Sequence, residues 1–259
     1  MRSQVPTLRW FYQKGSPVKV LILGAGQGSR LLPLTEDIPK ALLDIGGKRL
    51  IARQIEAFVS CGVREFVVIT GYAVAKMEQA LSEIADSLSV SIRTVFNPFY
   101  SVADNLASCW MARAEMDGEF IQVNGDNVFA ADMVERLLAA PPHPVTVAVN
   151  YKNSYDADDM KVVLEGERLR DIGKTLPTDK VHAEAIGFYI FRGEGGALYR
   201  RVLERAMREP ASLKQWFPSA IGTLARQTDV RTVPVSDVQW CEVDFPADLD
   251  QARKLVAGW

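Results

Sequence analysis

The sequence predicts an α/β protein with a Rossmann-like sheet that is mixed, mostly parallel and flanked by helices. Two observations lead to this fold class. Short apolar runs alternate with amphipathic segments through the first half of the 259-residue chain, which is typical of βαβ units with right-handed crossovers. After Pro141 and Pro142, several strand-like runs follow one another with fewer helical segments between them. We therefore expect one α/β domain that carries an inserted region.

The first half starts with a short apolar run, residues 18–23, which ends at Gly24 and suits a buried parallel strand. Similar runs predict strands at 65–70, 90–95 and 120–123. Amphipathic helices are expected at 50–61, 74–84, 105–114 and 131–138, and Gly62 would end the first of them.

The second half is expected to be richer in strands. Apolar runs predict strands at 145–150, 160–165, 169–172, 186–191 and 231–235. Helices are expected at 197–208, at 213–226 and, after Val243 and Asp244, at 246–256.

Composition excludes several classes of protein. Hydrophobic residues make up 48% and charged residues 24% of the chain, as in an ordinary globular protein. The formal net charge of −2 gives no overall basic field, so nucleic acid is not an expected partner. No apolar run approaches the roughly 20 residues that span a bilayer. Cys61, Cys109 and Cys241 form neither a disulfide framework nor a metal-binding pair, so we expect a reducing, cytoplasmic location.

Residues 1–17 are expected to form an N-terminal arm. The arm carries Trp10, Phe11 and Tyr12 among basic residues, and it lacks the apolar core of a signal peptide. We expect it to pack on the body of the protein or on a neighbouring subunit, with a membrane-surface anchor as the alternative. A homodimer is compatible with the first arrangement.

A glycine-rich segment follows the first predicted strand. Its glycines allow a sharp turn and present backbone N–H groups to phosphate oxygens, while Arg30 and Lys40 add positive charge. The spacing does not fit a dinucleotide fingerprint, which needs glycine where Ser29 or Leu31 stands. It does not fit a P-loop either, because the segment ends in Ser29-Arg30 and not in Gly-Lys-Ser/Thr. A plain turn beside a surface arginine is the alternative.

The stretch LILGAGQGSRLLPLTEDIPKALLDIGG resembles the signature of the sugar-phosphate nucleotidyltransferase superfamily, whose fold is GT-A-like. The resemblance implies that Arg30 and Lys40 are catalytic, binding the triphosphate and stabilising the departing pyrophosphate. It also implies a nucleotide-binding set, namely Leu23, Gly24, Ala25, Gly26, Gln27, Gly28, Ser29 and Gly125. Residues 18–140 would then form a nucleotide-binding half, residues 141–240 an acceptor-binding half, and residues 241–259 a metal-binding segment with the closing helix.

Two aspartates are candidate metal ligands. Asp126 follows a predicted strand, and Asp244 follows another short apolar stretch. Mg2+ is usually held by one or two carboxylates together with phosphate oxygens. Taken alone, Asp126 is equally a turn residue and Asp244 a helix N-cap before Pro246. The family resemblance links them as a Mg2+-binding pair, matching a strand-end Gly-Asp motif and a V-D-x-P-like segment.

The segment from Asn97 to Trp110 resembles the corresponding part of the phosphocholine and 2-aminoethylphosphonate cytidylyltransferase branch. The match implies that Asn105 and Ser108 contact the nucleotide, and it favours CTP. A helix N-cap is the alternative role for Asn105. Asp104 stands where that branch often has asparagine, so the match is firm at those two positions only.

The acceptor is expected to contact the second half of the chain. Lys174, which follows a predicted strand, matches a family lysine that binds the acceptor phosphate, and Lys161 is a second candidate. Glu184 and Gly187 match a segment that lines the acceptor pocket, and Trp240 is a further candidate. Aromatic and acidic side chains would suit an acceptor that carries an ammonium group.

The sequence thus predicts a Mg2+-dependent nucleotidyltransferase that joins CTP to a small phosphorylated alcohol or phosphonate and releases pyrophosphate. Phosphocholine and 2-aminoethylphosphonate are the first candidate acceptors. A sugar-1-phosphate or inositol-phosphate nucleotidyltransferase that uses UTP, dTTP or CTP is the alternative. A non-catalytic nucleotide-binding regulatory protein is an alternative of another class.

Overall fold

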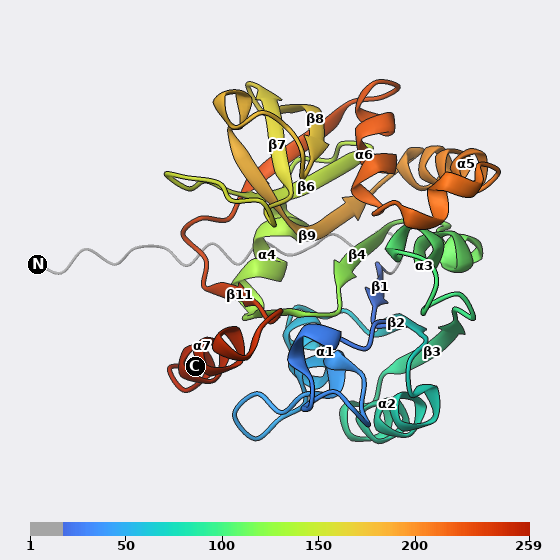
Figure 1. Cartoon of the computed structure of the whole chain (residues 1–259), viewed down its shortest axis with the longest axis vertical. Coiled ribbons are helices and arrows are strands. Elements are labelled where there is room, and N and C mark those ends of the chain that lie inside the picture. Colours follow the sequence, from blue (N-terminus) through green and yellow to red (C-terminus); the bar gives the residue numbers. More distant parts are fainter. Residues whose placement is uncertain (1–17) are drawn as a thin grey trace, which may run out of the picture.

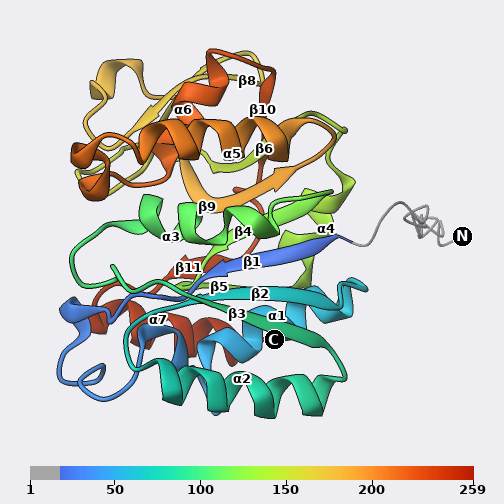
Figure 2. The ribbon, with the colours of Figure 1, turned by 90° about the vertical axis from the view of Figure 1, so that its right-hand side faces the viewer.

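A computed structural model describes residues 18–259 of the chain, and the expected N-terminal arm lies outside the described residues. A mixed sheet with helices on both faces dominates the described part (Figures 1 and 2). Its strands are β1 (Lys19–Leu23), β2 (Glu65–Thr70), β3 (Ser91–Phe96), β4 (Phe120–Asn124), β6 (Val145–Asn150), β7 (Lys161–Glu165), β8 (Arg168–Gly173), β9 (Ala183–Phe191) and β10 (Val230–Pro234). Within residues 18–259 these nine strands lie in the order β3-β2-β1-β4-β9-β6-β10-β8-β7.

The helices form a layer on each side of the sheet. They are α1 (Leu50–Ser60), α2 (Val74–Leu88), α3 (Asn105–Met111), α4 (Ala131–Ala139), α5 (Gly195–Ala206), α6 (Pro218–Ala225) and α7 (Pro246–Val256). Side chains alternate along β1, so that Val20 and Ile22 pack with α1, α2 and α4, while Leu21 packs with α3, α5 and α6. The expected α/β fold with a mixed sheet flanked by helices is confirmed. The sheet is not mostly parallel, because β9, β8 and β7 pair with their neighbours in antiparallel register.

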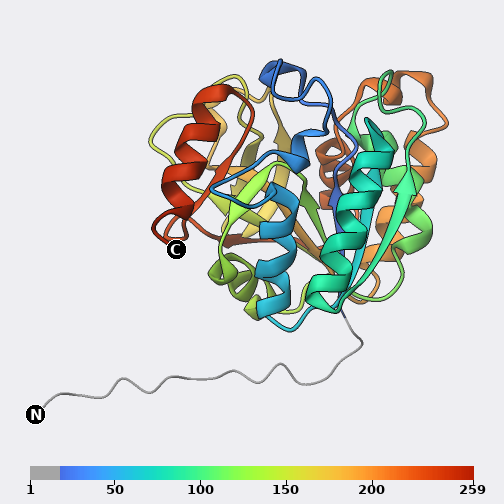
Figure 3. The same cartoon turned by 90° about the horizontal axis from the view of Figure 1, so that it is seen from below.

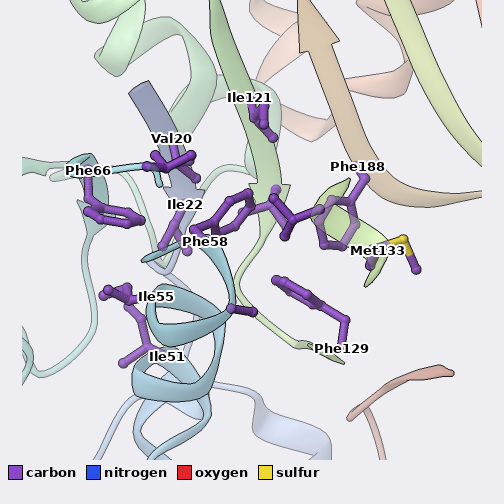
Figure 4. Close-up of a cluster of buried hydrophobic side chains, with 14 of the residues drawn as sticks. Val20, Ile22, Ile51, Ile55, Phe58, Phe66, Ile121, Phe129, Met133 and Phe188 are labelled. Carbon is purple, nitrogen blue, oxygen red and sulfur yellow. The ribbon is translucent and has the colours of Figure 1, made fainter. Parts of the chain in front are cut away.

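Aromatic side chains fill the core beneath α1 (Figure 4). Phe58 points from α1 toward the sheet, and its ring lies 6.3 Å from that of Phe66, 5.7 Å from that of Phe129 and 6.4 Å from that of Phe188. All four side chains are buried. Because these residues come from α1, β2, β9 and the chain after β4, the cluster joins the two halves of the sequence.

Strand direction changes along the sheet. The strands β3, β2, β1 and β4 run parallel, as expected of the first half. The strand β9 lies antiparallel between β4 and β6, and it also pairs with β7. One continuous sheet therefore carries both halves of the chain.

The C-terminal segment returns to the first half. A second, two-stranded sheet pairs β5 (Asn127–Phe129) with β11 (Trp240–Glu242) in antiparallel register. After β11 the helix α7 packs against Leu31, Leu43 and Leu50, and lies beside α1 (Figure 3). The C-terminal segment thus packs on Leu31, which directly follows the glycine-rich loop.

One local expectation needs correction, and two short strands were not expected. The helix expected at 213–226 is divided: a short 3-10 turn (Pro210–Lys214) precedes α6, which starts only at Pro218. Proline has no N–H to donate and suits the first turn of a helix, where none is needed. The strands β5 and β11 did not follow from the sequence pattern because each is only three residues long. Across residues 18–259 no helix is both long and apolar enough to cross a membrane.

Candidate active site

The glycine-rich loop leaves the sheet at the carboxyl end of β1, where open parallel sheets place their ligands. Gly24 N donates to Ile69 O at 3.0 Å and Tyr72 N donates to Ala25 O at 3.0 Å, so the end of β2 holds the start of the loop. At Gly26, apart from the glycine itself and its two neighbours in the chain, no heavy atom of the described chain lies within 4 Å of the place a Cβ would occupy. This part of the backbone is open to a ligand.

The rest of the loop packs against Lys40. Gly28 has a φ of +78°, and a Cβ at this residue would lie 2.9 Å from the Cβ of Lys40. Thr35 fixes the loop from the other side: its hydroxyl donates to Gly28 O at 2.8 Å, and its carbonyl accepts from Gln27 Nε2 at 3.4 Å. The Pro-Leu-Thr segment therefore sets the shape of the loop.

Asp126 lies in the turn between β4 and β5. Gly125 N donates to Leu23 O at 3.1 Å, and a Cβ at position 125 would come within 2.5 Å of that oxygen, so glycine is required there. Buried Gln54, on α1, donates from Nε2 to Asn124 O at 2.9 Å and to Asn127 O at 2.8 Å. These bonds hold the turn on both sides of Asp126.

The pairing of β5 with β11 brings Asp244 beside Asp126. Glu242 stands opposite Asn127, and Val243 N donates to Asp126 O at 3.1 Å. Asp248 accepts from the backbone N–H of Asp244 at 2.9 Å. Asp244 is therefore not the N-cap of α7, a position that Phe245 holds.

Both predicted cations reach this pair of aspartates. Lys40 Nζ donates to Asp126 Oδ2 at 3.0 Å and also to Asp244 Oδ1. Arg30 Nη1 lies 3.3 Å from Asp244 Oδ2, and its guanidinium stands 5.2 Å from the centre of the Phe245 ring. Burial disfavours the charged ammonium of Lys40, but the two carboxylates outweigh it and raise the pKa of Lys40. The structure thus brings Arg30, Lys40, Asp126 and Asp244 together.

Glu242 is a third acidic residue at this point, and it did not follow from the sequence. The side chain is accessible along the cleft, yet protein crowds its carboxyl group. This desolvation, followed by repulsion from Asp126 and Asp244, raises the pKa of Glu242 to about 8. A signal was present, because alternate residues of an extended segment point to the same side, as Glu242 and Asp244 do.

These three carboxyl groups fit a divalent cation. One oxygen from each of Asp126, Glu242 and Asp244 lies within 4.8 Å of the others. Asp126 Oδ1 is buried and finds no hydrogen-bond donor among residues 18–259. Hard oxygen donors of this kind are those that Mg2+ prefers, so the residues match the expected ion.

A cleft of about 430 Å³ lies beside the carboxyl cluster. Acidic residues dominate its lining, namely Asp126, Asp156, Asp158, Asp159, Glu184, Glu242, Asp244 and Asp248. Of the predicted acceptor residues, Lys174, Glu184, Gly187 and Trp240 line it. The surroundings therefore favour a ligand that carries positive charge as well as a phosphate.

Lys174 shows how such a positive charge is held. Its ammonium lies 4.5 Å from the centre of the Trp216 ring and 3.6 Å from Asp158 Oδ1. Trp216 is 44% exposed and forms part of the cleft lining. An aromatic face and a carboxylate thus already form a seat for a cation.

Glu184 belongs to a charged network deeper in the cleft. Lys152 Nζ lies 2.7 Å from Glu184 and 2.8 Å from Asp159, and Asn150 Nδ2 donates to Glu184 at 2.8 Å. Burial is the largest influence on Glu184 and raises its pKa. The network holds two acidic side chains at the cleft wall with a single lysine between them.

Lys161 and Ser108 are not part of the cleft lining. Lys161 is buried, and its ammonium donates to the carbonyl oxygens of Asp156 and of Lys174, the latter at 2.9 Å. In this structure its ammonium is thus occupied by backbone carbonyl oxygens, and the expected contact with the acceptor stays a prediction. Ser108 is also buried and accepts a hydrogen bond from Asn97 Nδ2 at 3.0 Å.

Asn105 lines the cleft, as expected of a ligand contact. The alternative role as helix N-cap is wrong, because Asp104 holds that position and Asn105 is the first residue of α3. Its Oδ1 accepts from Phe217 N at 2.8 Å. The side chain therefore ties the start of α3 to the segment before α6.

The site of this α/β protein therefore combines a glycine-rich loop at the end of β1 with cations and carboxyl groups that face one another. A family model described as "Nucleotidyl transferase" matches residues 19–157, which is more than half of the chain. The chain therefore belongs to the nucleotidyl transferase family, which confirms the expected superfamily.

Similar proteins support the same class. The chain is 28% identical over 236 residues to the bifunctional IPC transferase and DIPP synthase of Aquifex aeolicus, covering 91% of this chain and 51% of that protein. It is 28% identical over 251 residues to the CMP-5'-(3-aminopropyl)phosphonate synthase of Streptomyces rubellomurinus, covering 91% of this chain and 38% of that protein. The chain thus spans about half of the first relative and less of the second.

A solved structure shares the fold. The inositol-1-phosphate CTP transferase from T. maritima superimposes with a TM-score of 0.79, covering 95% of this chain and 97% of that one. The two sequences are 18% identical, so the likeness concerns the fold.

Proposed function

We propose that the protein is a Mg2+-dependent cytidylyltransferase whose acceptor carries a phosphate or phosphonate at one end and an ammonium group at the other. CTP and this acceptor would give a CMP-linked product and pyrophosphate. The observation that carries the proposal is the seat in the cleft, where Trp216 and Asp158 hold the ammonium of Lys174. If the acceptor phosphate bound the ammonium of Lys174, Trp216 and Asp158 would be free to contact the ammonium group of the acceptor.

The charge of the cleft favours the same class of acceptor. Eight acidic side chains line the cleft, and they would repel an acceptor that carries negative charge alone. Sugar 1-phosphates and inositol phosphates have no cation to offset this repulsion. The name of the Streptomyces relative specifies a product with CMP, a phosphonate and an amine, which supports CTP and an aminophosphonate.

The reaction needs no side chain to remove a proton, because a phosphate or phosphonate oxygen is already ionised at neutral pH. Its lone pair forms a bond to the α-phosphorus of CTP. The bond from that phosphorus to the bridging oxygen breaks, and its electron pair leaves with pyrophosphate. Arg30 and Lys40 would bind the β- and γ-phosphates, so that positive charge meets the charge that develops on the leaving group.

Asp126 and Asp244 would hold Mg2+, with Glu242 beside them. The bound ion would offset the negative charge that gathers where the acceptor and the α-phosphate meet. The turn that Gln54 clamps would keep Asp126 in place, and the β5–β11 pairing would keep Asp244 next to it. Most of the catalytic effect would therefore come from positioning and electrostatics.

A pyrophosphate-release assay tests the proposal. The purified full chain is mixed with Mg2+, one of CTP, UTP, dTTP or GTP, and one acceptor from a panel. The panel includes phosphocholine, 2-aminoethylphosphonate, glucose 1-phosphate and inositol 1-phosphate. Ethylphosphonate, which lacks the ammonium group but is otherwise matched to 2-aminoethylphosphonate, serves as the control. We expect turnover with CTP and an ammonium-bearing acceptor, and far less with ethylphosphonate.

Two outcomes would contradict the proposal. Turnover with UTP or dTTP and glucose 1-phosphate, but none with CTP, would support the sugar-phosphate alternative. Nucleotide binding without pyrophosphate release for any acceptor would support a non-catalytic regulatory protein.

A further inference from the structure

The ammonium of Lys40 donates hydrogen bonds to the carboxylates of both Asp126 and Asp244. It bonds to Asp126 Oδ2 at 3.0 Å and to Asp244 Oδ1, and the side chain is only 12% exposed. The stem of Lys40 packs against Gly28 in the glycine-rich loop. Lys40 therefore stands between the loop and the carboxyl cluster, within reach of both.

This placement differs from the role that the proposed reaction gives to Lys40. One ammonium cannot neutralise the two aspartates and the triphosphate at the same time. A divalent cation needs the same carboxylates, and two cations on the same pair of anions repel each other strongly at such short range. Lys40 and the metal are thus competitors for one site.

The carboxyl cluster needs a positive counter-charge whether or not a metal ion is bound. Asp126, Glu242 and Asp244 offer oxygens within 4.8 Å of one another, so without a counter-charge they would repel one another. Lys40 satisfies one oxygen of each aspartate, while Asp126 Oδ1 stays without a donor among the described residues. Lys40 therefore keeps the two aspartates close together and leaves Asp126 Oδ1 available to bind a metal ion.

We propose that Lys40 is a positioning residue that takes the place of the divalent cation in the nucleotide-free protein. It would hold Asp126 and Asp244 together until a triphosphate draws its ammonium away and the metal takes over. The second half of this exchange rests on the proposed function, whereas the competition between Lys40 and the metal does not require it.

Metal binding without nucleotide tests the competition. Mn2+ is titrated into the full chain, and free Mn2+ is followed by electron paramagnetic resonance. We expect Lys40→Met to bind Mn2+ at least about tenfold more tightly than the unchanged protein, because a competing charge is gone. Lys48→Met removes a lysine charge that pairs with Glu56 and not with the aspartates, and we expect a change of no more than about twofold. Equal affinities for the unchanged protein and Lys40→Met, or equal gains in both variants, would overturn the proposal.

Thermal unfolding gives a second measurement. In EDTA, Lys40→Met should unfold at a lower temperature than the unchanged protein, because its carboxylates have lost their counter-charge. Mg2+ should raise the midpoint of Lys40→Met by more than that of the unchanged protein. Equal Mg2+ shifts in both would contradict the exchange. If Lys40→Met does not fold, Lys40→Gln, which keeps a polar side chain, is measured in its place.

Neither measurement uses an acceptor or turnover. A protein that shows the competition but transfers no cytidylyl group would disprove the proposed function alone. A protein that transfers the group but binds Mn2+ equally with and without Lys40 would disprove this inference alone.

Discussion

Arg30 is the loop cation whose removal should affect catalysis with little effect on stability. Its side chain is 47% exposed, and exposed ion pairs contribute little to folding. Arg30→Ala should lower kcat by about 100- to 1000-fold, the effect of removing one electrostatic stabiliser. Pyrophosphate release measures kcat, and a thermal melt measures stability. Arg49→Ala, which removes a similarly exposed arginine that pairs with Glu83, is the control. Near-normal turnover of Arg30→Ala would exclude the role.

Trp216 should act on the acceptor and not on the nucleotide. Trp216→Leu removes the aromatic face of the cation seat, and we expect KM for an ammonium-bearing acceptor to rise by about 3- to 30-fold, as cation–π energies predict. The KM for CTP should stay the same. Trp259→Leu is a matched control, since Trp259 is 43% exposed and is not part of the cleft lining. A rise in KM for CTP alone would contradict this assignment.

At the scale of single residues, short motifs were predictable and remote partners were not. Arg30 and Lys40 lie in one stretch with a specific pattern, so their importance could be inferred from the sequence. Asp126 and Asp244 needed the family resemblance, because only the fold brings them together. The burial of Lys161 could not be predicted, because in sequence a lysine that bonds to backbone carbonyls looks like a lysine that binds a ligand.

At the scale of elements, the hydrogen bonds from Gln54 on α1 to the turn after β4 can be tested directly. Gln54→Met keeps the shape of the side chain but leaves the carbonyl oxygens of Asn124 and Asn127 without their donor. An unsatisfied buried group costs about 1–3 kcal/mol, so the melting temperature should fall. We also expect weaker Mn2+ binding, because the turn that holds Asp126 is loosened. Gln79→Met, at an exposed position of α2, should change neither quantity. Unchanged Mn2+ affinity in Gln54→Met would show that the clamp does not position Asp126.

Short apolar runs and amphipathic segments made most strands and helices predictable. The exceptions are two very short strands and a helix that a proline shortens. The strands of the main sheet were found because most of them are short apolar runs and the others, such as β3, alternate apolar and polar residues. The strands β5 and β11 are too short for a periodic signal, although their pairing is what brings the aspartates together. The helix expected at 213–226 was wrong because the pattern alone ignored Pro218.

For the whole molecule, the core beneath α1 should control stability. Phe58→Ala should lower the free energy of unfolding by about 3–5 kcal/mol, because the ring is fully buried against Phe66, Phe129 and Phe188. Urea unfolding measures the change. Phe99→Ala removes a ring that is 41% exposed and should change the free energy far less. Similar losses in both variants would show that the core does not dominate stability.

The order of the strands could not be predicted, because it depends on contacts between distant parts of the chain. The sequence indicated strands in both halves, but nothing local places β9 between β4 and β6. Hydrogen bonds along β9 make this placement, and they join segments that lie far apart in the sequence.

Because β9 fills the space between β4 and β6, the stretch from 19 to 157 cannot be treated as a portable module, although it matches the family model. Expressed alone, it would leave the facing edges of β4 and β6 unpaired, and unpaired edges invite association with other chains. Swapping acceptor halves between relatives at residue 157 would likewise break the sheet. A chimaera has a better chance of staying monodisperse if β4, β6 and β9 all come from the same parent.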